Sequence, residues 1–163
     1  MNVLQAFDCD FMSSPFFEFE QDFVGSLRCI PMTVRRSLDT CGVKLKLEHW
    51  NQFSKAERQN LVEWPCTTAH EAQTYRDKLQ SLITQKTGIP AKTLEIPSNP
   101  SWQNTQEIPA QVQQKFAEQS VPLSLSQWAA LTDLQRFALI KLSRPSHENN
   151  NFIPAIQEFG LAQ

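Results

Sequence analysis

The chain contains little glycine. Its 163 residues include only four glycines, and these are isolated from one another: Gly25, Gly42, Gly88 and Gly160. Loops that bind phosphate groups need several glycines within a few residues, so that backbone N–H groups can approach the phosphate closely. The sequence therefore excludes a glycine-rich phosphate loop, and we expect neither nucleotide hydrolysis nor dinucleotide binding.

A strong excess of charge and a long apolar run are both missing. The net charge is -2 and the isoelectric point is about 5.9, and the basic residues are scattered rather than gathered in tracts. Such a chain has no general attraction for polyphosphate, so we do not expect nucleic acid as a partner. No stretch approaches the roughly 18 apolar residues of a membrane span, and residues 1–11 lack the pattern of an export signal. We therefore expect a cytoplasmic protein with no membrane partner.

Paired cysteine motifs are also missing. The four cysteines occur at irregular spacings with no CxxC pair: Cys9, Cys29, Cys41 and Cys66. This pattern indicates neither a zinc ribbon nor a secreted disulfide framework, and buried reduced thiols are the simpler interpretation. A metal or iron–sulfur carrier that uses Cys29, Cys41 and Cys66 with a histidine stays open, because Cys66 and His70 are four residues apart. No local motif indicates an activated nucleophile, so we predict no enzyme activity and no bound cofactor.

What the chain does contain is an internal similarity. Residues 30–65 align without gaps onto residues 108–143 with nine of the 36 positions identical, whereas about two or three identities are expected by chance. The identical positions are mostly apolar and include Trp50 with Trp128. With 40% hydrophobic and 20% charged residues, a chain of this length can form one compact core. We interpret the chain as two diverged copies of one helical unit.

Proline and glycine predict the ends of a short helix in each copy. Pro31 suits the first helical position, where its missing N–H is not needed, and Gly42 suits the position just after the last turn. We therefore predict helices at residues 31–41 and 109–119. The alternating segment that follows, residues 43–47, could be a strand by periodicity alone, but its counterpart contains Pro122 and Ser124 and is followed by Ser126. We interpret both segments as extended chain that leads into a helix.

Three capping boxes predict the starts of further helices. In this motif a serine or threonine, and a glutamate or glutamine three residues later, each accept a backbone N–H at the start of a helix. The three boxes are Ser54–Glu57, Thr68–Glu71 and Thr132–Gln135. We predict that the helices end at Pro65, Gly88 and Pro145, respectively. A shorter counterpart of the helix after Thr68 is expected at residues 152–159.

The predicted fold class is all-α, with two diverged tandem copies of a helical unit joined by a proline-rich linker and packed as one compact domain. We expect an N-terminal arm at residues 1–22, the first repeat at 23–87, the linker at 88–107 and the second repeat at 108–163. The arm could be extended or could form a first helix. The linker is expected to pack through its apolar side chains, namely Ile89, Leu94, Ile96 and Trp102.

Charge distinguishes the two copies. Arg35 and Arg36 align with Gln113 and Gln114 of the second copy, so the first copy alone has a basic face, which Arg28 joins. We predict that these three arginines bind an acidic protein partner, with a solvated helix face as the alternative. Trp50 and Trp128 are interpreted as core residues rather than a ligand-stacking site. Arg58 and Arg136, which are also identical between the copies, are interpreted as structural partners of a nearby carboxylate or helix end.

Three stretches of the sequence resemble a known family. Residues 19–23 (FEQDF), 26–32 (SLRCIPM) and 38–45 (LDTCGVKL) are similar to the nitrate-reductase-associated proteins of cyanobacteria, and the similarity continues through residues 50–66. The resemblance implies a small protein that accompanies the assimilatory, ferredoxin-dependent nitrate reductase, an enzyme with a molybdenum cofactor and an iron–sulfur cluster. It also implies that the protein is needed for the activity of the reductase without being its catalytic part.

We therefore predict a non-catalytic accessory protein that binds nitrate reductase and acts in its assembly, cofactor insertion or stability. A metal or iron–sulfur carrier, and a general helical adaptor unrelated to nitrate, stay open as alternatives.

Overall fold

The computed structural model describes residues 14–145 and 150–163. The helices have the following bounds: η1 (Glu18–Glu20), α1 (Gln21–Val24), α2 (Met32–Cys41), α3 (Leu47–Asn51), α4 (Lys55–Glu63), α5 (Ala69–Thr87), η2 (Ser101–Gln103), α6 (Ala110–Glu118), α7 (Leu125–Ala130), α8 (Asp133–Leu142) and α9 (Phe152–Glu158), where η marks a short 3-10 helix. Within the same residues there is no strand, and Val43 and Thr93 form an isolated antiparallel bridge. The predicted all-α class is confirmed. No helix in the described part is both long and apolar enough to cross a membrane.

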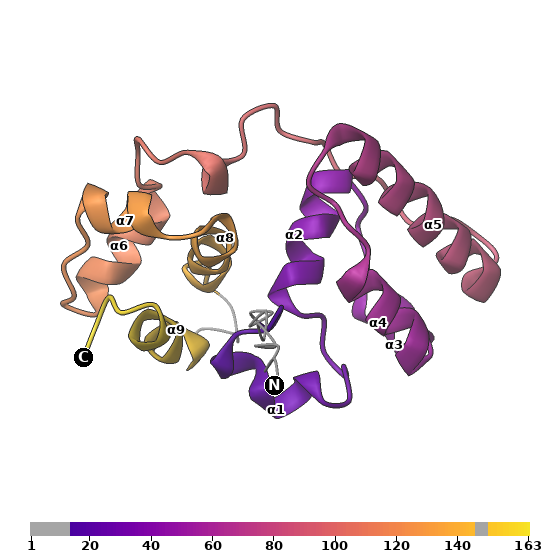
Figure 1. The fold of residues 1–163 in the computed structure, drawn as a ribbon, viewed down its shortest axis with the longest axis horizontal. Coiled ribbons are helices and arrows are strands. Elements are labelled where there is room, and N and C mark those ends of the chain that lie inside the picture. The colour runs from indigo at the N-terminus through magenta and orange to yellow at the C-terminus, as the bar shows by residue number, and fades with distance from the viewer. Residues whose placement is uncertain (1–13, 146–149) are drawn as a thin grey trace, which may run out of the picture.

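The helices form two groups with α2 between them. Figure 1 shows α3, α4 and α5 on one side of α2 and α6, α7, α8 and α9 on the other. Each group surrounds its own buried cluster, the first containing Trp50 and Tyr75 and the second containing Trp128 and Phe137. The interpretation of the two groups as diverged copies of one unit stays a prediction.

Helix α2 takes part in both clusters. Val34 and Leu38 are buried in the first cluster, whereas Met32 is buried in the second. Near the C-terminal end of α2, Asp39 forms an ion pair with Lys141 of α8, with 2.8 Å between Oδ2 and Nζ. Helix α2 therefore fixes the position of one group relative to the other.

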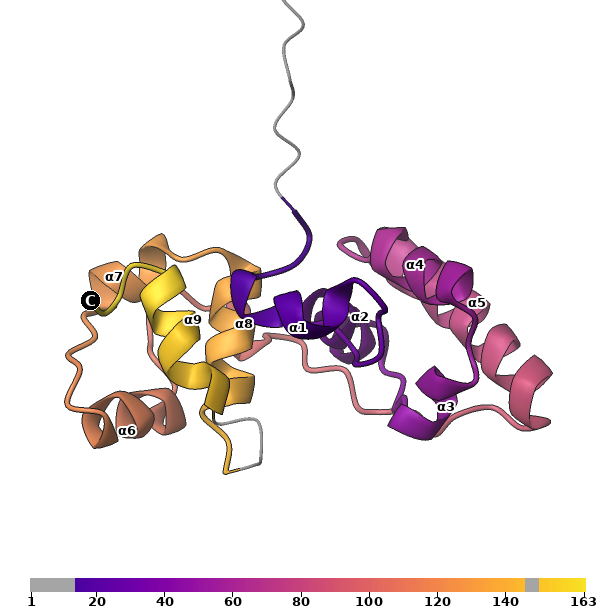
Figure 2. The same ribbon diagram turned by 90° about the horizontal axis from the view of Figure 1, so that it is seen from below.

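The described part of the N-terminal arm packs against the C-terminal helix. The Phe17 ring stacks on Phe19 and meets Phe159 edge-on, with 5.1 Å between ring centroids in each pair. Figure 2 shows the first described residues, drawn in indigo, running past α8 to α1 and α2. Of the two conformations left open for this segment, the chain adopts the short helices η1 and α1. Phe17 and Phe19 thus pack against the second cluster, although they precede the first group in sequence, whereas Phe16 packs against the first.

The capping boxes are confirmed at all three sites. The side chains of Ser54, Thr68 and Thr132 each accept the backbone N–H of the third residue after them, at 3.1 Å in every case. Helix α5 ends before Gly88, which has a φ of 87°, as predicted. These contacts lie within a single helical turn, so the local sequence is sufficient to specify them.

Two predicted helix ends are too late. Helix α4 ends at Glu63 rather than at Pro65, because Trp64 precedes a proline and is held in extended conformation with a ψ of 131°. Helix α8 ends at Leu142, three residues before Pro145. The predicted starts at Pro31 and Pro109 are one residue too early. Both prolines have extended ψ angles, 157° and 140°, and lie just before the helices.

The prediction for the linker is correct for one side chain of four. Trp102 is 7% exposed and its ring meets that of Phe137 edge-on at 5.2 Å. The other three are substantially exposed: Ile89 (69%), Leu94 (37%) and Ile96 (50%). The physical reason is that Gln80 of α5 holds the backbone of Ala91 through two hydrogen bonds of 2.8 and 3.0 Å. The backbone, rather than these apolar side chains, attaches the linker to the first group.

The repeated tryptophan and arginine pairs are structural, as predicted. The Trp50 ring donates from Nε1 to the Leu27 carbonyl at 2.7 Å, and Arg58 donates to the same oxygen at 3.1 Å. In the second group, Trp128 donates from its ring nitrogen to the Asn104 carbonyl at 2.9 Å. Arg136 donates from Nε to the Trp102 carbonyl at 2.6 Å. Both tryptophans are fully buried. Each pair thus satisfies backbone groups that the fold removes from water.

We expect Gly42→Ala to destabilise the protein more than Gly88→Ala. Both glycines have positive φ, 76° and 87°, so alanine at either position costs about 1–2 kcal/mol of backbone strain. At Gly42 an added Cβ would also lie 2.8 Å from the Leu94 carbonyl oxygen and from Ile96 Cγ1. At Gly88 nothing in the described residues lies within 4 Å of it. Urea unfolding of both variants measures the difference, and equal losses would show that the chain around Leu94 moves aside.

Candidate functional site

A groove lies beside α2 where the two groups of helices meet. One part is a hollow of about 430 Å³ between α2, the segment before α3, the linker and α8. A second hollow of about 310 Å³ lies on the side of η1 and α1. Cys29, Ile30 and Arg35 line both hollows. We call the two hollows together the α2 groove.

Positive side chains predominate in the first hollow of the α2 groove. Among the described residues that line it, Arg35, Lys44 and Lys141 accompany one carboxylate, Asp39. The remaining lining is Cys29 and apolar side chains: Ile30, Leu38, Val43, Leu45, Leu47 and Leu94. Because Lys141 already pairs with Asp39, the hollow keeps an excess of positive charge beside apolar surface. Such a surface is complementary to acidic and apolar side chains.

The structure separates the three arginines predicted to bind a partner. Arg28 precedes α2 and is exposed. Arg35 is half-buried in the groove, where its Nε donates to the Ile30 carbonyl at 3.1 Å and its charge lies near the Glu20 carboxylate. Arg36 is also half-buried, but its charge lies near Cys66 in the first group. Arg35 therefore faces the groove and Arg36 does not, and a joint docking role stays a prediction.

The three described cysteines do not form one site. Cys29 is half-buried in the α2 groove, whereas Cys41 and Cys66 are buried in the first cluster. No group of three or more histidine, cysteine, aspartate or glutamate side chains in residues 14–145 and 150–163 could hold a metal ion. The set of Cys29, Cys41 and Cys66, considered for a metal or iron–sulfur carrier, is thus not brought together by the fold. Cys9 lies outside the described residues.

Two glutamates that the sequence analysis did not select lie where the arm contacts α9: Glu20 in η1 and Glu158 at the end of α9. Glu20 is buried and accepts the N–H groups of Phe17 and Met32 at 3.1 and 2.8 Å; burial nevertheless raises its pKa. Glu158 accepts the N–H of Glu18, and burial raises its pKa as well. Its Oε2 is buried and has no hydrogen-bond partner among the described residues. The alternation of phenylalanine with glutamate in residues 16–20 is the sequence feature that could have indicated a buried glutamate here.

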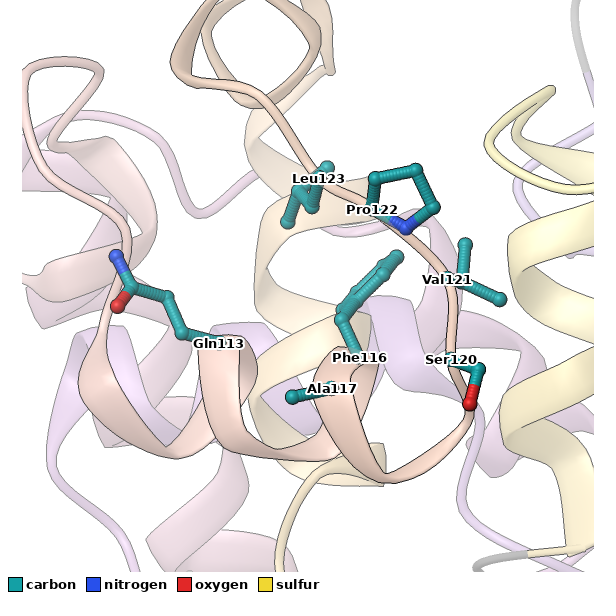
Figure 3. A pocket seen from close by; sticks show the side chains of 7 residues that line it. All are labelled: Gln113, Phe116, Ala117, Ser120, Val121, Pro122 and Leu123. Carbon is teal, nitrogen blue, oxygen red and sulfur yellow. The ribbon is translucent and has the colours of Figure 1, made fainter.

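A separate hollow lies between α6 and the segment that follows it. Its volume is about 490 Å³. Figure 3 shows the Phe116 ring directed toward Pro122 and Leu123, while Gln113 and Ser120 point away from it. None of the residues that line this hollow is charged. The hollow offers no chemistry comparable with that of the α2 groove.

We expect Glu158→Gln to stabilise the protein at neutral pH. A carboxyl group whose pKa is raised by folding favours the folded state below its ordinary pKa, about 4.3, and this contribution is lost as pH rises through the raised value. The neutral amide avoids that loss, so the unfolding temperature at pH 7 should rise by roughly 1–3 °C, a small effect because the side chain is partly exposed. The gain should vanish below pH 4. The exposed Glu95→Gln serves as the control, and an equal gain there would contradict the explanation.

Comparison with known proteins identifies one family. Residues 16–159 match the family described as conserved nitrate reductase-associated protein. No curated protein and no solved structure matches the chain. The match begins within the N-terminal arm and ends just after α9, so it includes α2 and both groups of helices.

Proposed function

This chain belongs to the conserved nitrate reductase-associated proteins, and we propose that it is a non-catalytic accessory protein of the assimilatory nitrate reductase. It binds the enzyme in the cytoplasm and acts in its assembly, cofactor insertion or stability. The observation that carries the proposal is the extent of the family match, which includes almost the whole described structure. The family description itself connects such chains with nitrate reductase.

The α2 groove is the surface that we propose for binding the enzyme. It combines an excess of positive charge with exposed apolar side chains, of which Leu47 is 53% exposed. Arg28 is exposed in the segment that leads into the groove. A segment of the reductase with acidic and apolar side chains is complementary to this surface, because opposite charges steer the encounter and apolar contact excludes water.

The first test compares nitrate reductase produced with and without this protein in the same cells. We expect the molybdenum content, the iron content and the specific activity of the reductase all to fall in the absence of the protein. A fall in metal content would identify cofactor insertion as the affected step, and a loss of enzyme without a change in metal per molecule would identify stability. Unchanged content and activity would contradict the proposal and leave the general helical adaptor.

A second test reverses charges at the groove. We expect Arg28→Glu combined with Lys44→Glu to weaken the complex with nitrate reductase roughly tenfold, which corresponds to about 1.4 kcal/mol. Both side chains are exposed, so helicity should be unchanged. Arg35 is left intact because its hydrogen bond to the Ile30 carbonyl supports the fold.

The matched control is Lys55→Glu combined with Arg144→Glu, which makes the same change in net charge at exposed positions that do not line the groove. Binding is measured by co-purification and by binding isotherms. Equal weakening by both double variants would show that the α2 groove is not the docking surface.

A further inference from the structure

Cys41 and Cys66 are brought together by the first group of helices. Cys41 is the last residue of α2, and Cys66 lies between α4 and α5. Their sulfurs meet two consecutive carbonyl oxygens of α2: Cys66 Sγ lies 3.6 Å from that of Ser37 and Cys41 Sγ lies 3.8 Å from that of Leu38. Both side chains belong to the first buried cluster, and each thiol shifts the pKa of the other. Residues 25 positions apart in sequence thus form a dithiol pair.

The surroundings make the two sulfurs unequal. A hydrogen bond from Cys41 to the Cys66 thiolate lowers the pKa of Cys66. The Ser37 side chain and the positive charge of Arg36 act in the same direction, against burial and the charge of Glu71. The same hydrogen bond and burial raise the pKa of Cys41. Cys66 is also nearer to solvent, with 8% of its surface exposed against 1% for Cys41. A thiolate, rather than a thiol, is the nucleophile in cysteine chemistry.

We propose that Cys41 and Cys66 are a redox-active pair that a peroxide converts to an intramolecular disulfide, with Cys66 as the attacking sulfur and Cys41 as the resolving one. The Cys66 thiolate attacks one oxygen of hydrogen peroxide, the O–O bond breaks, and the leaving hydroxide takes a proton to become water. Cys41 then attacks the Cys66 sulfenic acid, the S–S bond forms, the S–O bond breaks and a second water leaves. The two thiols lose two electrons and two protons, and the peroxide gains them.

The disulfide would link the C-terminal end of α2 to the segment before α5. Helix α2 also lines the groove and contacts both buried clusters. Oxidation of the pair therefore acts on the element that joins the two groups of helices. The proposal concerns this chain alone and is independent of the identity of any partner.

Peptide mapping of the full chain tests the pair. The reduced protein is treated with hydrogen peroxide, denatured, alkylated with N-ethylmaleimide and digested. We expect Cys41 and Cys66 to be recovered as one disulfide-linked pair, with Cys29 still open to alkylation. Cys29→Ser, which leaves the pair intact, should behave like the parent chain. Recovery of Cys41 and Cys66 as alkylated thiols, or in disulfides with Cys9 or Cys29, would overturn the proposal.

Single variants test the assignment of roles. In Cys41→Ser, peroxide should leave a sulfenic acid on Cys66 that dimedone labels, whereas Cys66→Ser should give little label on Cys41. Stronger labelling of Cys41 than of Cys66 would reverse the assigned roles and contradict the proposal. Circular dichroism confirms that each variant is folded. Alanine replaces serine if the buried hydroxyl disturbs the first cluster, and the same labelling outcomes then apply.

Discussion

The packing of α2 between two buried clusters is the constraint on which the rest of the structure depends. Val34 and Leu38 fill the first cluster, and Met32, at the start of the same helix, fills the second. The ion pair between Asp39 and Lys141, with side chains 25% and 17% exposed, adds a directional contact between the groups. Since both clusters need the same helix, a change that displaces α2 removes apolar contacts from both of them.

The candidate docking surface follows from this arrangement. A helix that is shared by two groups cannot be covered completely by either of them, and the uncovered part of α2 becomes the floor of the groove. The positive charge around it belongs to α2, to the segment before α3 and to α8, so it is assembled from both groups. A surface of this kind exists only in the folded chain, as the proposed binding to nitrate reductase requires.

Buried polar groups hold the segments around α2 in place. Arg58 donates to the carbonyl oxygen of Leu27, between α1 and α2, and Arg136 donates to that of Trp102 in the short helix η2. Glu20 accepts the backbone N–H of Met32, at the start of α2. Loss of Arg136 or Glu20 would take the hydrogen-bond partner from a backbone group away from water, which costs more than the hydrogen bond itself contributes. After loss of Arg58 the Leu27 carbonyl would keep the bond from Trp50. At the opposite end of α2, the proposed oxidation of Cys41 and Cys66 would add a covalent link to the packing contacts.

The sequence by itself determined the helical class, the three capping boxes and the core role of Trp50 and Trp128. Capping groups meet within one helical turn, and aligned apolar positions indicate burial without any knowledge of what covers them. Only the tertiary structure decided which linker side chains are exposed, that Arg35 and Arg36 face different groups, and that Cys41 meets Cys66 rather than Cys29. It also decided that Glu158 lies beside Glu18, 140 positions away. These features depend on contacts between distant segments, and local patterns contain no information about the orientation in which two packed helices present their side chains.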